Sequence, residues 1–530
     1  MGFKNKFITI LLSMVMVTSS NAGNILCIIV FPAYSHQQPL LALSEKLARR
    51  GHNLTVLTTD PPKKPIPNYT YIDMSSAYKN LKEMDEKFGF NLQREMSAAE
   101  IFKKLPQVFS ELCDYELGLP QVQAFIGKAA SMKFDAVLIE NQYYSSFHGL
   151  THKLGSPPVI GVHTFVPWSA LDEFMGVKVN PSYMPHIFSH HSDSMTFLER
   201  CFNTFLYWYN WYLVEYELFP YQEAILKKYF GTNTPSAREM EFNKSLLLVP
   251  ADLSVAYPMS IPPNYVRTGT FHIQPSPEPL LKDLKQWIDA AEQGIVYFSL
   301  GSNMQGTSVP REKREIFFKT IRRFPKIRFF WKYEAESPLS NVPSNLLIRK
   351  WFPQQSILVH PKCRIFISQG GLQSTEEAIY YAVPLLVIPL FADQPHQAAK
   401  IEKEGAGLSL LLSRLTEDNF YDVISSMLTD PKFKSNMNRL SSLSKDQMVP
   451  ALDEAAWWVE YVIRHKGARH LRPQNLNMNW IQVQLVDVYG AIVAAALFVL
   501  YIIYKLIKSI VALIPLGKSK KGKKAKSKRS

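Results

Sequence analysis

Continuous apolar runs that alternate with helix-like stretches constrain the fold of this chain most strongly. Residues 24–31 read NILCIIVF and residues 53–58 read NLTVLT, with a helical stretch at 39–50 between them. A strand that is buried on both faces needs such a run, and the strand–helix–strand order favours a parallel sheet. Further strands of this sheet are predicted at 134–139 and 158–162. The first part of the chain is therefore predicted to be an α/β domain.

A Pro-rich stretch at 258–279 has the composition of a linker, and a second alternation begins after it. Strands are expected at 294–300, 327–333, 346–348, 364–368 and 384–388, and helices at 311–323, 375–381 and 394–404. The chain thus reads as two similar α/β halves with a hinge near residue 270. A ligand is expected in the crevice where the two halves face each other.

The net charge of +14 at pH 7 is concentrated at the two ends of the chain. Residues 505–530 carry nine Lys, one Arg and no acid, and Lys4 and Lys6 lie in the leader. The body between them is nearly neutral, which excludes a protein that binds the phosphate backbone of nucleic acid. Four cysteines in 530 residues exclude a fold held together by disulfides.

The first 22 residues have the order of a secretory signal peptide. Lys4 and Lys6 precede an apolar stretch, and Ser20 and Ala22 are the small residues that suit cleavage after Ala22. Three Asn-x-Ser/Thr sequons, at Asn53, Asn68 and Asn243, agree with a body that enters the endoplasmic reticulum lumen. Asn53 is expected to begin a strand, too buried for modification, whereas Asn68 lies in a Pro-rich loop and is the best candidate.

Residues 487–504 are predicted to form a single transmembrane helix. Residues 488–504 hold no charge, and the basic tail at 505–530 follows directly. Because positive charge marks the cytoplasmic side, the tail is predicted to be cytosolic and the body lumenal, as in a type I protein of the endoplasmic reticulum membrane. Lys526 and Lys528 have the spacing of a dilysine retrieval signal; simple attraction to anionic lipid explains the same lysines equally well.

Residues 205–221 contain nine aromatic side chains in seventeen residues. Packing of a buried helix in the core is the favoured interpretation. The wall of an apolar substrate pocket and a surface at the membrane interface remain as alternatives.

The densest motif lies at residues 366–394, FISQGGLQSTEEAIYYAVPLLVIPLFADQ. A buried strand ends at Ser368, and two glycines then allow a tight turn before a helix opens. The amino end of a helix offers free N–H groups and partial positive charge, which suits a phosphate. Glu376 and Glu377 are expected in its first turn, where one of them can hold ribose hydroxyls.

This motif resembles, position by position, the signature of the UDP-glycosyltransferases, and the resemblance extends over essentially the whole chain. It implies a GT-B fold of two Rossmann-like domains that face a cleft. Residues 23–270 would bind the acceptor and residues 271–450 the UDP-sugar. Residues 451–486 would form a helix that crosses back to the first half, followed by a juxtamembrane segment; a simple stalk is the alternative.

The resemblance also implies a role for each matching residue on the uridine and sugar sides. Trp351, in WFPQQ, would stack on uracil with Gln354 beside it, and Glu377 would hold the ribose hydroxyls. Asp393 and Gln394 would hold the hydroxyls of the sugar. These roles are chemically sensible, because a flat indole suits a flat base and a carboxylate suits a diol.

On the diphosphate side, the resemblance assigns contacts to Ser302, Gln369 and Ser374, with Gly371 allowing close approach of the backbone. The residues around Gln369 resemble those of the insect branch of the family, whereas vertebrate and plant members usually have His at this position. Gln369 would therefore be a neutral donor to the diphosphate.

His36, in AYSHQQP, follows the first strand at the end that faces the crevice. In the family this position carries the general base, and its partner acid follows a strand of FDVILAD type. The matching stretch here, residues 134–140, reads FDAVLIE, so Glu140 stands where vertebrate members often have Asp. Asp135 is expected at the other end of that strand, too far away to help.

We therefore expect an inverting, metal-independent hexosyltransferase that takes glucose from a UDP-sugar, its co-substrate, to a hydroxyl of a small lipophilic acceptor such as a phenolic, xenobiotic or steroid-like compound. His186, His190 and His191 are interpreted as a polar loop, because no fourth metal ligand is in view. Two alternatives stay open: transfer of glucuronate, and a catalytically silent, membrane-anchored protein that binds lipophiles. The sequence leaves open whether the chain forms a homo-oligomer.

Overall fold

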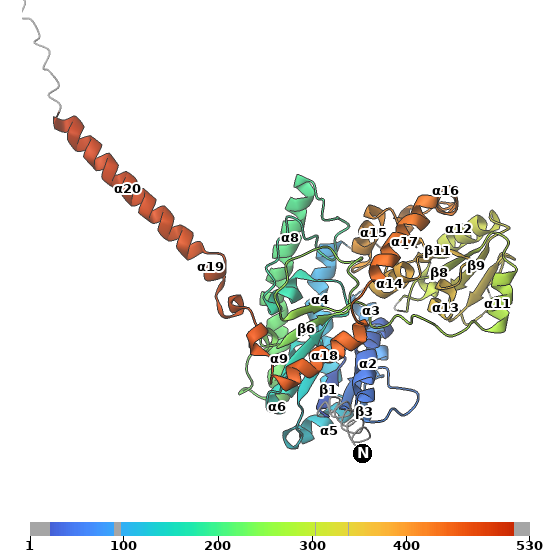
Figure 1. Cartoon of the computed structure of the whole chain (residues 1–530), viewed down its shortest axis with the longest axis horizontal. Helices are drawn as coiled ribbons and strands as arrows, with labels where there is room; N and C mark the ends of the chain where they lie inside the picture. The colour runs from blue at the N-terminus through green and yellow to red at the C-terminus, as the bar shows by residue number, and fades with distance from the viewer. Residues whose placement is uncertain (1–21, 89–96, 303, 338, 514–530) are drawn as a thin grey trace, which may run out of the picture. The chain divides into compact units, whose positions relative to one another are not determined.

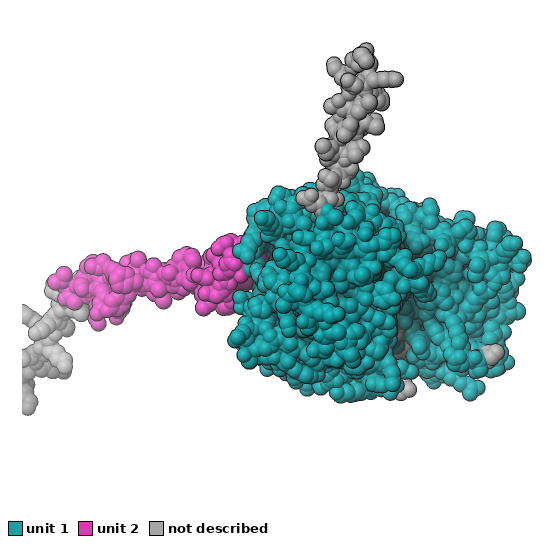
Figure 2. Space-filling view, turned by 90° about the horizontal axis from the view of Figure 1, so that it is seen from below, with its two compact units in different colours: residues 1–473 teal, residues 474–530 magenta. Residues whose placement is uncertain are grey.

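A computed structural model describes residues 22–88, 97–302, 304–337 and 339–513. Most of the predicted signal peptide and of the basic tail lie outside these residues. The chain divides into two compact units, Met1–Pro473 and Gln474–Ser530, which Figure 2 shows in teal and magenta.

The described residues of the first half form a seven-stranded, fully parallel sheet in the order β3-β2-β1-β4-β5-β6-β7. Its strands are β1 Asn24–Ile28, β2 Asn53–Thr58, β3 Tyr69–Asp73, β4 Ala136–Glu140, β5 Val159–Val162, β6 Leu246–Val249 and β7 Tyr265–Arg267. The four predicted strands are confirmed as β1, β2, β4 and β5. β1 lies between β2 and β4, so the strand order reverses at β1, and the carboxyl end of such a strand is where sheets of this kind bind ligands.

The described part of the second half forms a six-stranded parallel sheet in the order β10-β9-β8-β11-β12-β13. Its strands are β8 Ile295–Ser299, β9 Arg328–Lys332, β10 Leu346–Arg349, β11 Cys363–Ser368, β12 Leu385–Val387 and β13 Gly407–Ser409. All five predicted strands are confirmed, and β13 is added at the edge. Here the order reverses at β8, between β9 and β11.

Helices cover the first sheet (Figure 1): α2 Tyr34–Arg49, α3 Ala77–Phe88, α4 Ala98–Leu117, α5 Pro120–Lys128, α6 His148–Lys153, α7 Ser169–Asp172, α8 Phe197–Leu213, α9 Phe219–Phe230 and α10 Ala237–Phe242. The predicted start of α2 at residue 39 is wrong, since the helix begins at Tyr34 and contains Pro39. A proline inside a helix leaves the carbonyl four residues earlier without its N–H partner. In α2 that carbonyl belongs to Ser35.

The helices of the second half are α11 Lys282–Asp289, α12 Arg311–Arg322, α13 Gln354–Leu358, α14 Leu372–Tyr380, α15 Gln394–Lys403, α16 Glu417–Thr429, α17 Pro431–Lys445 and α18 Ala451–Arg464. α14 begins at Leu372, directly after its N-cap Gly371, and not at residue 375 as predicted. The prediction that Glu376 and Glu377 lie in its first turn is therefore wrong; they lie one turn further along.

α18 packs against α2 although about 400 residues separate them in the sequence (Figure 1). Ala455 and Val459 lie in one buried cluster with Leu43 and Leu47. At the edge of this contact, the guanidinium of Arg50 donates two hydrogen bonds to Glu460, at 2.8 and 2.9 Å. The segment after the second half thus returns to the first half and is not a simple stalk.

The second unit contains α19 Trp480–Val483 and α20 Val486–Leu513. Among the described residues, α20 is the one helix long and apolar enough to cross a membrane, with a mean hydropathy of 2.3 over its most apolar window. The predicted span at 487–504 lies inside it, and the helix continues past Lys505 and Lys508.

The aromatic stretch at 205–221 runs through α8, a π-helical turn at Val214–Leu218 and the start of α9. Five of its aromatic side chains are exposed: Phe205, Trp208, Tyr212, Tyr216 and Tyr221. The favoured prediction of core packing is wrong for these residues. A repeat of 3.6 residues marks helix faces only where polar residues occupy the other faces, and here aromatics occupy several of them.

Candidate active site

His36 and Glu140 form a buried pair at the point where the first sheet reverses its strand order. His36 lies in the first turn of α2, after β1, and Glu140 is the last residue of β4. Nδ1 of His36 lies 2.7 Å from Oε1 of Glu140, and both side chains are almost fully buried. A carboxylate at Nδ1 favours the tautomer that carries its proton there, which leaves Nε2 free to accept a proton.

The Glu140 carboxylate is held from several sides. The backbone N–H groups of Val30 and Phe31 donate to Oε2, at 3.2 and 2.9 Å. The hydroxyl of Thr164 donates to Oε1 at 3.2 Å. Three donors besides the imidazole fix the position of the group. The extra methylene of Glu relative to Asp is therefore accommodated in an ordered position.

Gln142 and Thr164 are parts of this network that the sequence analysis missed. The Gln142 amide donates to the Thr164 hydroxyl at 2.8 Å, and its oxygen accepts a hydrogen bond from Tyr144 at 3.3 Å. Each residue lies two positions after the end of a strand, β4 or β5. Polar residues at neighbouring carboxyl ends of a parallel sheet meet at one edge, so this signal was present in the sequence. Asp135, at the other end of β4, accepts a hydrogen bond from the backbone of Asn24.

Aromatic rings surround the imidazole. The His36 ring lies 4.6 Å from Phe31 and 4.9 Å from Phe165, between ring centroids. The rings continue away from His36 through Phe109, Tyr143, Tyr144, Trp168 and Phe188. The indole N–H of Trp168 is buried and has no hydrogen-bond partner within the described protein. Rings of this kind provide large apolar contact area, and an unpaired donor among them can bind a polar group.

In the second half, the carboxyl ends of β8 and β11 approach the amino end of α14. Gly301, after β8, has φ +80°, and Gly370, after β11, has φ +86°, a region that glycine adopts without strain. The Gln369 amide lies directly against Gly301, where a β-carbon would come within 2.2 Å of it. The exposed Ser302 follows Gly301, so the predicted diphosphate contacts meet around the start of α14.

Glu377 is held by the two glutamines of the WFPQQ segment. The amide of Gln354 donates to Oε2 of Glu377 at 2.8 Å and to the hydroxyl of Ser374 at 3.2 Å. The amide of Gln355 donates to Oε1 at 3.0 Å. Burial raises the pKa of Glu377 to about 7, against the lowering effect of these two donors. The geometry brings together Gln354 and Glu377, two of the three residues that were assigned to the uridine.

Asp393 and Gln394 lie where α15 begins. Asp393 is its N-cap, and Oδ2 of this buried carboxylate has no partner within the described protein. Burial raises the pKa of Asp393 to about 7. A buried, unpaired acceptor of this kind fits a site for a ligand hydroxyl. The Gln394 side-chain oxygen accepts hydrogen bonds from the backbone of Leu390 and Phe391, at 2.8 and 3.1 Å, which fixes the residue beside Asp393.

Trp351 is exposed, as a residue that stacks on a base must be. Its ring meets the edge of Tyr34 at 5.9 Å between centroids, and the Lys332 ammonium lies 5.4 Å from the ring centre. Tyr34 belongs to the first half and stands two residues before His36. The predicted uracil site therefore borders the turn that carries the predicted base.

Three further contacts hold the two halves together next to these groups. The amide of Gln373, in α14, donates to the backbone carbonyl of Ser35. Oε1 of Glu376 accepts a hydrogen bond from the backbone N–H of Asp252 at 2.8 Å, and the Ser444 hydroxyl bonds the Asp252 carboxylate at 2.5 Å. The first turn of α2 and the first turn of α14 thus face each other, with His36 at one and the predicted diphosphate site at the other.

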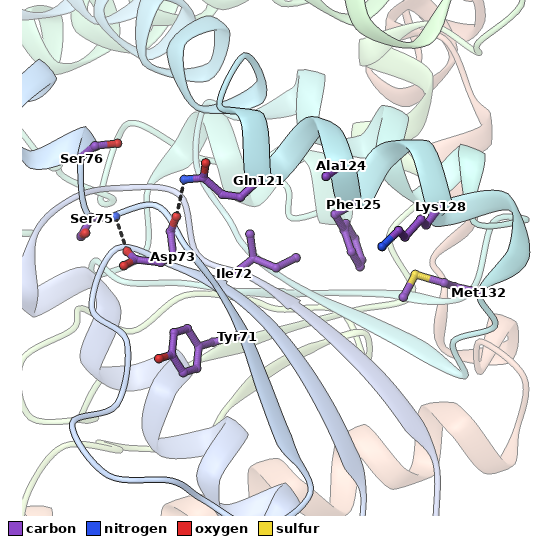
Figure 3. Close-up of a pocket in the computed structure, with 10 residues that line it drawn as sticks. All are labelled: Tyr71, Ile72, Asp73, Ser75, Ser76, Gln121, Ala124, Phe125, Lys128 and Met132. Atoms are coloured by element: carbon purple, nitrogen blue, oxygen red, sulfur yellow. Dashed lines mark hydrogen bonds between the residues drawn. The ribbon is translucent and has the colours of Figure 1, made fainter.

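Other candidates lie outside this arrangement. His186, His190 and His191 lie in a loop, as predicted; within it His186 is buried against Phe102, and burial lowers its pKa to about 3. Within the described ranges, no group of three or more His, Cys, Asp or Glu side chains is arranged to hold a metal ion. A hollow of about 570 Å³ lies between β3 and α5. Figure 3 shows the residues that line it, and none of them is a predicted site residue.

Comparisons with known proteins identify the family of this chain. Residues 25–521 match the model of the family described as UDP-glucoronosyl and UDP-glucosyl transferase. UDP-glucosyltransferase 2 of Dactylopius coccus is 35% identical over 483 residues, which cover 89% of this chain and 90% of that protein. UDP-glucuronosyltransferase 1A1 of Homo sapiens is 32% identical over 501 residues, covering 91% and 90%.

Solved structures show the same fold at low identity. The glycotransferase of kitacinnamycin superposes with a TM-score of 0.56 at 17% identity, covering 84% of this chain and all of that chain. The glycosyltransferase VinC, solved in complex with DTDP, gives a TM-score of 0.54 at 16% identity, covering 83% of this chain and all of that chain.

Proposed function

Because this chain belongs to the UDP-glucuronosyl and UDP-glucosyl transferase family, we propose that it transfers glucose from UDP-glucose to a hydroxyl group of a small lipophilic acceptor. Transfer of a sugar from a UDP-sugar co-substrate to an acceptor, on a GT-B fold and without a metal ion, is the activity of the family. The choice of glucose, the class of acceptor and the roles of single residues are our proposal.

The observation that carries the proposal is the buried His36–Glu140 pair opposite the start of α14. Nε2 of His36 removes the proton from the acceptor hydroxyl, while Glu140 holds the Nδ1 proton and stabilises the imidazolium. The acceptor oxygen forms a bond to the anomeric carbon as the bond from that carbon to the diphosphate breaks. Attack in line with the leaving group inverts the configuration, and UDP leaves.

The leaving diphosphate gains negative charge, which the start of α14 offsets. Its free N–H groups and partial positive charge point toward the turn at Gly370 and Gly371. We assign the neutral donors Ser302, Gln369 and Ser374 to the diphosphate oxygens. Donors that are already in place need no reorganisation when charge develops, which is where such groups contribute most to the rate.

The sugar side of the site supports a neutral hexose. We assign the unpaired Oδ2 of Asp393 and the neighbouring Gln394 to sugar hydroxyls. A glucuronate carboxylate beside Asp393 would face another acid, and burial would make that repulsion costly. The name of the Dactylopius relative, a UDP-glucosyltransferase, points the same way. UDP-glucuronate is the donor to test beside UDP-glucose, since the human relative is a UDP-glucuronosyltransferase.

The rings around His36 support a flat, apolar acceptor. Phe31 and Phe165 contact the imidazole directly, and Phe109, Tyr143 and Trp168 continue the same cluster. Phenols and steroid-like alcohols present a hydroxyl on an apolar frame, which suits a base set among aromatic rings. An enzyme of this specificity would serve detoxification of xenobiotics, with residues 23–270 binding the acceptor and 271–450 the UDP-sugar.

We further propose that α20 anchors the chain in the endoplasmic reticulum membrane, with the body lumenal and the basic tail cytosolic. Asn53, Asn68 and Asn243 are all exposed, so the expectation that Asn53 is too buried for modification is wrong. A lumenal body would carry N-glycans at one or more of them. Endoglycosidase treatment of the expressed protein, with each Asn replaced by Gln in turn, reports both the orientation and the occupied site.

The function is tested with microsomes that contain the full-length chain. UDP-glucose, UDP-glucuronate and other UDP-sugars are each combined with a pool of phenols and sterols, and products are identified by mass spectrometry. The proposal predicts acceptor-dependent release of UDP and a glucoside product. Binding of acceptors without any UDP release would support the alternative of a catalytically silent protein that binds lipophiles. A glucuronide as the main product would support the alternative of glucuronate transfer.

A further inference from the structure

Beyond its first turn, which carries the partly exposed Glu199, the water-facing side of α8 lacks the polar residues that such a side normally carries. Between Cys201 and Tyr216, all of which the structure describes, every exposed residue is a cysteine or an aromatic: Cys201, Phe202, Phe205, Trp208, Tyr212 and Tyr216. From Phe202 on, each is three or four residues from the next, and Cys201 is four residues before Phe205, which places them in one stripe along the helix and its π-helical end. This stripe is called the aromatic face below.

The exposure of the aromatic face is large for side chains of this kind. Phe205 is 53% exposed, Trp208 46% and Tyr212 50%. The amino end of α8 extends the face with Phe197 and Leu198, at 69% and 75%. A helix on the surface of a water-soluble domain normally presents charged and polar residues to solvent. A contiguous apolar face of this size indicates a partner.

The opposite side of α8 fixes the helix to the body, so the aromatic face cannot turn inward. Leu206 and Leu213 are buried in the main core. Asn203 accepts a hydrogen bond from the backbone of His186 at 2.7 Å, and Asn210 accepts one from the hydroxyl of Tyr143 at 3.1 Å. Tyr143 belongs to the ring cluster that leads to His36. One helix thus presents one side to the proposed acceptor region and the other to the surroundings.

We propose that the aromatic face docks on the headgroup–acyl boundary of the bilayer that α20 spans. This inference rests on the anchoring proposed above. Tryptophan and tyrosine are the residues that proteins concentrate at membrane interfaces, because each combines an apolar ring with one polar group. The aromatic face supplies both, together with phenylalanines for the acyl side. The absence of exposed charge along Cys201–Tyr216 lets the stripe enter the boundary without burying an ion.

The second unit offers an independent sign that the chain meets this boundary outside α20. Trp480 and Ile481, in α19 just before the span, are 56% and 49% exposed, and Met478 and Leu485 are exposed beside them. Residues 474–485 form a short connection from the body to α20. A tether of about a dozen residues keeps the body within reach of the bilayer surface, which makes a bilayer the partner with the highest local concentration.

Cys201 makes the proposal directly testable, because it lies on the aromatic face and the other three cysteines are buried. An environment-sensitive maleimide dye is attached to Cys201 of the full-length chain in phosphatidylcholine nanodiscs. A fraction of the lipid carries a nitroxide near the headgroup end of its acyl chain, which quenches a dye that touches it. Two control proteins in a Cys201→Ser background carry the dye elsewhere: Val493→Cys in α20, and Glu312→Cys on the exposed side of α12.

We expect the nitroxide lipid to quench the dye at Cys201, and the emission of this dye to shift to shorter wavelength. The dye at Glu312→Cys should show no quenching and no shift. The dye at Val493→Cys must be quenched if α20 is anchored. If it is quenched and the dye at Cys201 behaves like that at Glu312→Cys, the docking inference is overturned while the anchoring stands. If the dye at Val493→Cys is not quenched, the anchoring itself fails, and the docking inference fails with it.

A variant of the aromatic face tests whether its side chains themselves bind the bilayer or the helix only lies near it. Phe205→Ser, Trp208→Ser and Tyr212→Ser are combined; because these side chains are exposed, the fold is expected to persist, which an unchanged melting temperature verifies. Quenching at Cys201 is expected to be lost and quenching at Val493→Cys retained. A second copy of the chain is the competing occupant. Efficient dimer formation by a short bismaleimide through Cys201 in the nanodisc, with no quenching by lipid, would overturn the proposal.

Discussion

The side-chain amide of Gln373 donates a hydrogen bond to the backbone carbonyl of Ser35, the residue before His36. This carbonyl is available because Pro39, four residues later in α2, has no N–H to offer it. One proline in the first half thus creates the acceptor that a helix of the second half uses. The contact fixes the turn that carries His36, the proposed base, relative to the start of α14.

Loss of this contact is expected to weaken catalysis without affecting the chemistry of either half. Gln373→Leu removes the donor at nearly constant size, and a single hydrogen bond is worth about threefold to tenfold in kcat/KM. Gln121→Leu is the matched control, since Gln121 also donates to a backbone carbonyl, that of Asp73, but far from the site. Equal kcat/KM values for the two variants would show that the contact plays no part.

Thr164 is predicted to act as a positioning residue for Glu140. Thr164→Val keeps the shape but removes the donor to a charged acceptor, which is expected to lower kcat by about tenfold. The KM for the UDP-sugar should not change, because Thr164 lies in the other half, and Thr164→Ser should restore most of the rate. Thr55→Val, on the surface of β2, is the control. A rise in KM with kcat unchanged would contradict the role.

Trp351 is predicted to bind the uracil ring. Trp351→Ala should raise the KM for the UDP-sugar by about tenfold, because stacking of a base on an aromatic ring is worth about 1–3 kcal/mol. Trp351→Phe should retain part of that affinity, and kcat should change little in either variant. An unchanged KM in Trp351→Ala would remove the residue from the donor site.

The binding of UDP-glucose is predicted to depend on pH through Glu377. Burial raises the pKa of this carboxyl to about 7, and the ionised form is the better acceptor for the ribose hydroxyls. The Kd for UDP-glucose should therefore fall as the pH rises from about 6 to about 8, while the diphosphate of this ligand keeps its charge. Calorimetric titration of wild type and Glu377→Gln measures this. The variant should bind more weakly and keep only the part of the pH dependence that Asp393, whose pKa is also raised to about 7, contributes. The same slope in both proteins would contradict the assignment.

Much of the fold follows from the sequence because parallel strands buried on both faces must be apolar along their whole length. β1, β8 and β11 show this plainly, and the residues after such strands lead directly to His36 and to the turn at Gly370. β3 was not predicted because it is an edge strand: it reads YTYID, is largely exposed, and so lacks a continuous apolar run. The start of α2 was predicted five residues too late because a proline is typical of a helix start. In the structure, tertiary contacts maintain the helical turn that precedes Pro39.

The network around His36, the proposed base, was only partly predictable. Glu140 follows from its place after an apolar strand, but the contacts of Gln142 and Thr164 depend on loops from two strands that meet in space. The aromatic face of α8 was unpredictable for a different reason. Aromatic residues occupy the exposed and half-buried sides of this helix, while its buried side carries two leucines and two asparagines, so the distribution of the aromatics does not mark the side that faces the protein.

The central claim is that the imidazole of His36 takes the proton of the acceptor while the second half holds the UDP-sugar. The most direct measurement compares wild type with His36→Gln for glucoside formation and for binding of UDP by calorimetry. We predict that kcat falls by about 10²–10⁴, the usual contribution of a general base, and that the Kd for UDP stays the same. Retention of more than about a tenth of the wild-type rate, with UDP still bound, would contradict the account.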